Sequence, residues 1–179
     1  KYLENRGSAQ CKSSVIFAGM RSEGTTIIKA KKSRNHTELL CKYLNLPITI
    51  RNKKNLDEIR VKKVKEIKSL NYNIPSDISS ASFFIVLAAL TPKSKLTIKN
   101  VNVNPSRMGV ISILKRMGVK IVIKNQKIYK GEKIANIKIE GSTKIKGINC
   151  PIKFNSSAID EFLIIFIVAA KAKGISYFK

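Results

Sequence analysis

Apolar residues along the chain fall into alternating helical and extended segments. One pattern recurs three times: a helix of small and apolar residues, a tight polar turn, and a short β-branched strand. The three copies cover residues 8–28, 77–98 and 157–178. Helices that alternate with strands in this way predict an α/β fold class.

A second helix and strand follow the first two copies. They cover residues 34–50 and 107–123, which align with each other without a gap. The repeated unit is therefore βαβαββ. Four remaining extended segments are predicted as strands: 58–63, 64–70, 127–130 and 134–139. The third copy of the pattern ends in a further predicted strand, residues 175–178.

Polar, turn-prone residues interrupt the pattern between Asn71 and Pro75. Proline has no N–H for a strand ladder, so Pro75 cannot continue a central strand. We therefore predict one domain over residues 1–73 and a second over residues 74–179. The chain does not begin with Met and ends inside a predicted strand, so we expect an internal fragment, with the second domain truncated at its C-terminal end.

The charge balance is extreme, with 35 Lys and Arg against 11 Asp and Glu, a formal net charge of +24 at pH 7. A nucleic acid, a membrane surface or a phosphorylated substrate would suit this charge. Most of the excess is Lys, and Ile and Asn are also frequent. All three have AT-rich codons, so a biased genome explains the charge as well. Aromatic residues do not interleave with the basic ones, so stacking platforms for RNA are not predicted.

Cysteine and motif content exclude several classes. The three cysteines form no CxxC pair and the chain has one His, so neither a disulfide framework nor a zinc site is predicted. This usage fits a reducing, cytoplasmic compartment. The longest apolar run, residues 162–170, is too short to span a bilayer. P-loop, Rossmann and zincin motifs are missing.

Small polar residues begin the predicted helices, among them Ser8, Asn35, Asp77 and Ser157. N-capping explains each of them singly, and Asn35 with Glu38 fits a capping box. Parallel helices packed in repeats would also aim several positive dipole ends the same way. Such a cluster binds anions.

Two of these helix starts are rich in anion-binding groups. Ser8, Ala9 and Gln10 offer a hydroxyl, backbone N–H groups and a carboxamide that can donate to a phosphate or carboxylate. Arg34, preceded by Ser33, could clamp a phosphate. An exposed arginine in the first helical turn explains Arg34 equally well.

Asp160 stands out by its context, because it and Glu161 open a very apolar helix. A structural explanation is that the positive end of the helix dipole, after an N-cap at Ser157, stabilises the Asp160 carboxylate. A carboxylate base at the lip of a site is the functional alternative. Four further basic residues could contact anions or lie on solvated faces: Lys12, Arg21, Arg107 and Arg116.

Six motifs lie at residues 8–19, 23–26, 33–38, 74–84, 101–107 and 159–162. Taken together, they resemble EPSP synthases, the 3-phosphoshikimate 1-carboxyvinyltransferases. Each motif is modest alone, but six in the same order are specific, and the Ser-Ala-Gln and Ser-Arg-x-His-Thr-Glu forms are similar to the bacterial class. The chain departs from the pattern with Ser76 in place of Gly and Leu163 in place of Pro.

The resemblance implies a two-domain, inside-out α/β barrel of βαβαββ units, incomplete in this chain. Residues 1–73 would be the later part of the shikimate 3-phosphate domain, and residues 74–179 part of the second domain. The implied activity moves the enolpyruvyl group of phosphoenolpyruvate to the 5-hydroxyl of shikimate 3-phosphate, in aromatic amino acid biosynthesis. A cytoplasmic monomer when full length, without metal or organic cofactor, is implied, and the fragment alone would be inactive.

The resemblance also assigns roles to residues. Asp160 corresponds to the catalytic carboxylate. Two alternatives stay open: the sister UDP-N-acetylglucosamine enolpyruvyltransferase, and a basic RNA-binding module built from similar repeats. The implied substrate-binding residues are Ser8, Ala9, Gln10, Ser33 and Arg34.

Overall fold

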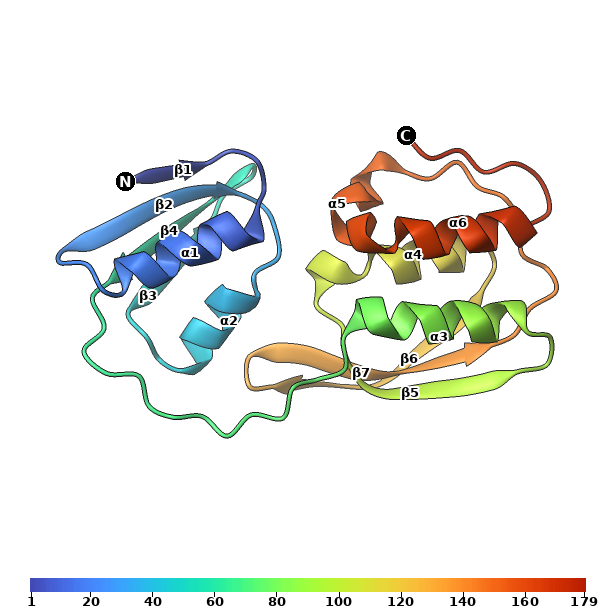
Figure 1. Ribbon diagram of the computed structural model, residues 1–179, viewed down its shortest axis with the longest axis horizontal. Helices are drawn as coiled ribbons and strands as arrows, with labels where there is room; N and C mark the ends of the chain where they lie inside the picture. The colour runs from blue at the N-terminus through green and yellow to red at the C-terminus, as the bar shows by residue number, and fades with distance from the viewer. The chain divides into compact units, whose positions relative to one another are not determined.

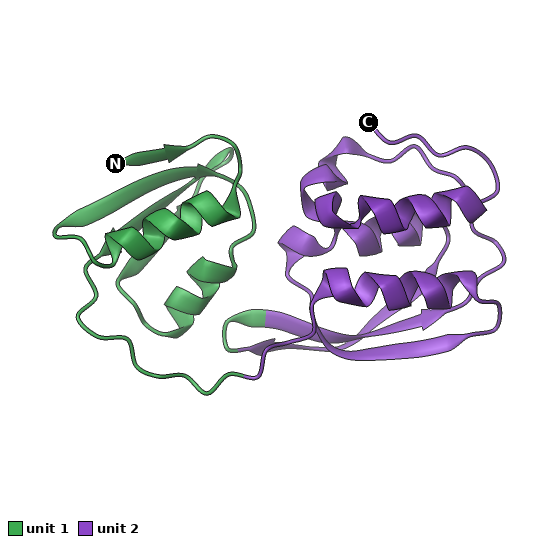
Figure 2. Cartoon of the chain, viewed as in Figure 1, with its two compact units in different colours: residues 1–72, 130–132 green, residues 73–129, 133–179 purple.

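The computed structural model describes residues 1–179, the whole sequence, as two compact units. Unit 1 comprises residues 1–72 and 130–132, and unit 2 comprises residues 73–129 and 133–179 (Figure 2). Each unit contains a sheet with helices, so the predicted α/β class is confirmed.

Unit 1 is a four-stranded sheet in the order β1-β2-β4-β3, with helices α1 and α2 packed against it (Figure 1). Strand β1 is parallel to β2, whereas β4 is antiparallel to both β2 and β3. The elements are β1 (Tyr2–Glu4), α1 (Ala9–Gly19), β2 (Thr25–Lys31), α2 (His36–Tyr43), β3 (Ile48–Asn52) and β4 (Leu56–Lys62).

The core of unit 1 follows from alternation along β2. Ile28 and Ala30 point inward and are fully buried, while the lysines beside them face outward. Ile59 on β4 and Ile16 on α1 complete the contact. This burial fixes α1 against the sheet, and with it the position of the helix N-terminus.

Unit 2 is a three-stranded sheet in the order β5-β7-β6. Helices α3 and α4 pack against this sheet, and α6 packs against those two helices (Figure 1). Strands β5 and β7 are antiparallel. The elements, with η for short 3-10 helices, are α3 (Ile78–Leu90), β5 (Lys95–Asn102), η1 (Pro105–Arg107), α4 (Gly109–Arg116), β6 (Lys120–Tyr129), β7 (Glu132–Glu140), η2 (Ile152–Phe154), α5 (Asn155–Ala158), η3 (Ile159–Glu161) and α6 (Phe162–Lys171).

Helix α3 is the central helix of unit 2. The carboxylate of Asp77 caps it by accepting from the backbone N–H of Ser80 at 2.9 Å, as its helix-start position predicts. Its buried residues Ile78, Ile85 and Ala89 pack against β5 and α6. No helix of either unit combines the length and the apolar character needed to cross a bilayer.

The structure corrects several predicted strands. Residues 64–70 form no strand: after Val64 donates to the carbonyl of Met20, the chain leaves the sheet. Residues 175–178 make only an isolated bridge, between Tyr177 and Asn149. The two strands expected between residues 119 and 130 are one strand, β6. Short, Lys-rich segments have the alternation of strands, but only a neighbouring strand can supply the ladder.

Candidate functional site

Helix α1 begins after Ser8, which is its N-cap residue. The Ser8 Oγ accepts a hydrogen bond from the backbone N–H of Cys11 at 3.2 Å, so the predicted cap is confirmed. Ala9 and Gln10 fill the first two helical positions, whose backbone N–H groups have no partner within the helix. The Gln10 side chain is exposed. This end of α1 therefore offers donors to an anion.

A buried lysine joins α1 to the segment that precedes α2. The Nζ atom of Lys12 lies 2.6 Å from Glu38 Oε1 and donates to the backbone carbonyl of Arg34 at 2.9 Å. The hydroxyls of Ser13 and Thr37 share a further hydrogen bond of 2.7 Å. The structure thus brings together two groups that the sequence separates by more than twenty residues, the start of α1 and the Ser33–Arg34 segment.

Two buried oxygens near this contact have no hydrogen-bond partner in the protein. They are the Ser33 Oγ and the second carboxylate oxygen of Glu38, Oε2. The expected capping box of Asn35 with Glu38 is wrong, because the Asn35 side chain does not cap α2 and Glu38 pairs with Lys12 instead. The sequence could not reveal this, since Lys12 lies on another helix.

Glu4, at the end of β1, stabilises the loop that leads into the same helix. Its carboxylate accepts the backbone N–H groups of Arg6 at 2.9 Å and Gly7 at 2.8 Å. Burial by itself would raise the pKa of Glu4, but the N–H groups of Ser8, Arg6 and Gly7 and the charge of Lys12 together hold that pKa below its ordinary value. Glu4 therefore stays ionised and fixes the loop that leads into α1.

In unit 2, Asp160 lies in η3 rather than in the first turn of a long helix. The helix predicted from residue 157 is broken into α5, η3 and α6, and the Ser157 Oγ donates to the carbonyl of Phe154 instead of capping. The Asp160 side chain is 47% exposed, whereas that of its neighbour Glu161 is 3% exposed. Of the two carboxylates, Asp160 is the one that a ligand can reach.

Arg107, at the end of η1, lies among the acidic groups of unit 2. Its guanidinium pairs with Asp77 at 3.0 Å, donates to the Ser79 hydroxyl, and lies 4.0 Å from Asp160 and 3.9 Å from Glu161. From the sequence alone, Arg107 is only one of several basic residues that could contact an anion. Its partners are distant along the chain, so nothing local to Arg107 reveals this role.

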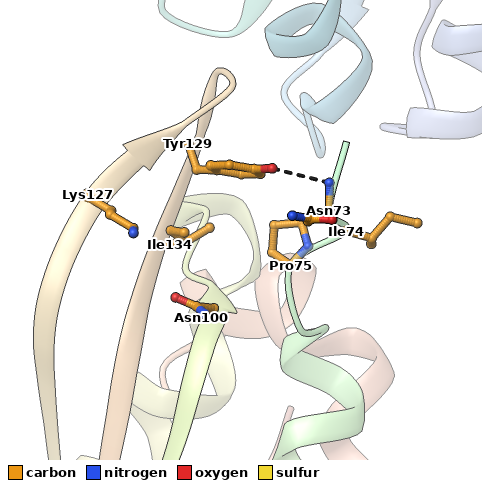
Figure 3. Close-up of a pocket in the computed structure, with 7 residues that line it drawn as sticks. All are labelled: Asn73, Ile74, Pro75, Asn100, Lys127, Tyr129 and Ile134. Carbon is orange, nitrogen blue, oxygen red and sulfur yellow. Dashed lines mark hydrogen bonds between the residues drawn. The ribbon is translucent and has the colours of Figure 1, made fainter. Parts of the chain in front are cut away.

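A pocket of about 170 Å³ lies elsewhere in unit 2. It is lined by residues 73–75, Asn100, Lys127, Tyr129 and Ile134, and it contains none of the predicted site residues (Figure 3). The Tyr129 hydroxyl accepts from the backbone N–H of Asn73 at 3.2 Å, which fastens the segment before α3 to β6. We interpret this pocket as a packing feature of that segment.

The cysteines provide no metal site. Cys11 is exposed, whereas Cys41 and Cys150 are buried, and all three are free. Burial raises the pKa of the Cys41 thiol, with a further contribution from the charge of Glu38, and burial also raises the pKa of Cys150. No cluster of three or more His, Cys, Asp or Glu side chains could hold a metal ion.

The fold places the chain in a defined class of proteins. It superposes on an EPSP synthase from Acinetobacter baumannii with a TM-score of 0.86 and 39% identity, covering 97% of this chain and 39% of that one. The enolpyruvyl transferase NikO from Streptomyces tendae shares the fold with a TM-score of 0.60 at 14% identity, over 87% of this chain and 35% of that one. The architecture is that of the enolpyruvyl transferases.

The sequence specifies the family within this class. Residues 2–179 match the family described as EPSP synthase (3-phosphoshikimate 1-carboxyvinyltransferase), and the chain belongs to it. It is 43% identical over 174 residues to the 3-phosphoshikimate 1-carboxyvinyltransferase of Legionella pneumophila (strain Lens) and 41% identical over 178 residues to that of Hydrogenovibrio crunogenus. Each alignment covers 97% of this chain, which spans 39% of the length of each relative.

Proposed function

We propose that the complete protein transfers the enolpyruvyl group of phosphoenolpyruvate to the 5-hydroxyl of shikimate 3-phosphate. In this reaction the hydroxyl oxygen attacks C2 of phosphoenolpyruvate while C3 gains a proton. The resulting tetrahedral intermediate loses a proton from C3 and expels phosphate. Membership of the EPSP synthase family supports this assignment.

The observation that carries the proposal is the contact between the start of α1 and the Arg34 segment. Lys12 holds the Arg34 backbone close to the first turn of α1, where the N–H groups of Ala9 and Gln10 have no helical partner. A guanidinium and a helix N-terminus are the groups that bind phosphate best. We therefore propose that Ser8, Ala9, Gln10 and Arg34 bind shikimate 3-phosphate.

Ser33 fits the same role. Its hydroxyl is buried and has no partner in the protein, and a buried donor without a partner costs about 1–3 kcal/mol. A ligand oxygen would supply that partner. We propose that Ser33 donates to the bound phosphate.

We propose Asp160 as the base that removes the proton of the attacking hydroxyl. Its carboxylate is half-exposed, as a group that must reach a substrate has to be, and Arg107 lies beside it. The chain spans 39% of its relatives, so we expect the 179 residues by themselves to give no turnover.

The test is phosphate release by the complete reading frame that encodes this chain. We expect release with phosphoenolpyruvate plus shikimate 3-phosphate, a fall of about 10²–10⁴-fold in kcat for Asp160→Asn, and a raised KM for shikimate 3-phosphate in Arg34→Gln. Arg21→Gln removes an exposed arginine of the same unit and is the matched control. Release that instead requires UDP-N-acetylglucosamine would identify the sister reaction.

A further inference from the structure

We infer that Arg107 is a positioning residue, which holds the Asp160 carboxylate in one orientation for proton removal. This inference rests on the proposed function, because it assigns Asp160 a catalytic role. It concerns a different residue and a different interaction, however, so that it can fail while the proposed function stands.

The first reason is that Arg107 is itself held firmly. Its side chain is 17% exposed, and one guanidinium nitrogen pairs with Asp77 Oδ1 at 3.0 Å while the other donates to the Ser79 hydroxyl. Both partners lie at the start of α3, one at the cap and one in the first turn. The planar fork of arginine can satisfy two such partners at once, which lysine cannot do.

The second reason is that the peptide carrying Asp160 has no regular helix to hold it. The three residues of η3 form a 3-10 turn between α5 and α6, a conformation that often marks a hinge or local strain in a helix. Asp160 is half-exposed there, so backbone geometry alone leaves its side chain several rotamers. The positive charge of Arg107, 4.0 Å away, favours one of them.

The third reason is that Arg107 and its partner Ser79 interact with both acidic residues of η3, Asp160 and Glu161. Ser79 accepts from Arg107 and donates to the carboxylate of Glu161, which is almost fully buried. The guanidinium itself lies 3.9 Å from Glu161 and 4.0 Å from Asp160. Glu161 therefore anchors the turn to α3, and the charge of Arg107 favours the Asp160 rotamer that points toward it.

A double-mutant cycle on kcat tests the inference in the complete reading frame. We expect Arg107→Gln to lower kcat at least about tenfold while KM for both substrates changes less than about twofold. If Arg107 acts through Asp160, the same change in an Asp160→Asn background should lower kcat by a further factor of less than about two. Arg107→Lys keeps the charge but not the paired contacts, so we expect an intermediate loss.

Arg116→Gln is the matched control, since Arg116 is an exposed arginine of the same unit that stacks on Phe154 at 5.5 Å. We expect it to leave kcat unchanged. Thermal melts accompany each variant, and if Arg107→Gln melts too low for assay, the cycle is measured with Arg107→Lys.

The outcomes separate the two claims. If Arg107→Gln lowers kcat by the same factor in the wild type and in Asp160→Asn, the positioning role is overturned. An arginine with a purely structural role would lower kcat whether or not the Asp160 carboxylate is present. An unchanged kcat in Arg107→Gln would overturn it as well. A wild type without release dependent on shikimate 3-phosphate would overturn the proposed function, and this inference with it.

Discussion

At the residue scale, backbone hydrogen bonds keep the buried carboxylate of Glu4 ionised. Glu4 is 2% exposed, yet it remains a carboxylate because two backbone N–H groups donate to it directly. Those N–H groups belong to the loop that turns into α1 at Ser8. The ionised form of one strand residue thus stabilises the loop that presents the proposed phosphate-binding end of α1.

We expect Glu4→Gln to reduce stability in a way that depends on pH. The folded-state pKa of Glu4 lies below its ordinary value, so its contribution is complete above about pH 4.3. That contribution is lost as the pH falls through the folded-state pKa. Urea unfolding at pH 7 should therefore show a loss of about 1–2 kcal/mol, because hydrogen bonds to a charged group are replaced by neutral ones.

The same measurement below pH 4 should show a smaller difference between Glu4→Gln and wild type. Glu66→Gln, at an exposed position of the same unit, is the control and should match wild type at both pH values. An equal loss at both pH values for Glu4→Gln would mean that shape, rather than charge, accounts for the effect.

At the scale of elements, the contact between α1 and the segment before α2 depends on a buried ion pair. Lys12 is 1% exposed and Glu38 4% exposed, and Lys12 also bonds the Arg34 carbonyl. A buried pair contributes little net stability compared with apolar residues of similar size, but breaking it leaves an unpaired charge. Its consequence here is geometric, because it sets where Arg34 lies.

We expect Lys12→Met to destabilise the protein by about 3–5 kcal/mol, since Glu38 would remain buried without its partner. The double variant Lys12→Met/Glu38→Leu should regain most of that stability. It should not regain the affinity for shikimate 3-phosphate, because the hydrogen bond from Lys12 to the Arg34 carbonyl is then missing. Chemical denaturation and the KM for the acceptor distinguish these two effects.

Lys53→Met provides the comparison for this pair. Lys53 also contacts a glutamate, Glu58 at 3.4 Å, but it is 59% exposed. An exposed pair contributes about 0–1 kcal/mol, so this variant should be nearly neutral. A double variant at Lys12 and Glu38 with normal acceptor affinity would show that Arg34 is positioned by other contacts.

At the scale of the whole molecule, the two units have cores of very different size. The core of unit 2 contains 24 buried residues, and that of unit 1 contains 8. Hydrophobic burial is the main favourable term in folding and grows with the apolar area removed from water. Within these 179 residues, unit 1 therefore has less apolar burial to oppose its opening, although it carries the proposed phosphate-binding residues.

We expect amide hydrogen exchange to proceed sooner in unit 1 than in unit 2. The central amides of β2 and β4 should exchange through openings of lower free energy than those of α3 and α4, because local opening follows local burial. Shikimate 3-phosphate should slow exchange selectively in unit 1, since a ligand stabilises the state that binds it. Equal protection in both units would indicate a single cooperative core.

The sequence by itself determined the fold class, most elements and the family. Period-2 and period-3.6 patterns depend only on neighbouring residues, so β2, α1, α3 and the caps at Ser8 and Asp77 could be predicted locally. Strand β1 was missed, because three residues carry no measurable period. The strand expected at residues 64–70 was wrong, because alternation cannot supply a pairing partner.

Only the tertiary structure decided which side chains act together. Glu38 fits a capping box in the sequence, but it pairs with Lys12 from another helix. Arg107 looks like an ordinary surface arginine until α3 and η3 bring Asp77, Ser79 and Asp160 around it. Local sequence fixes backbone preference, whereas charge pairing depends on distances of about 4 Å that packing alone sets.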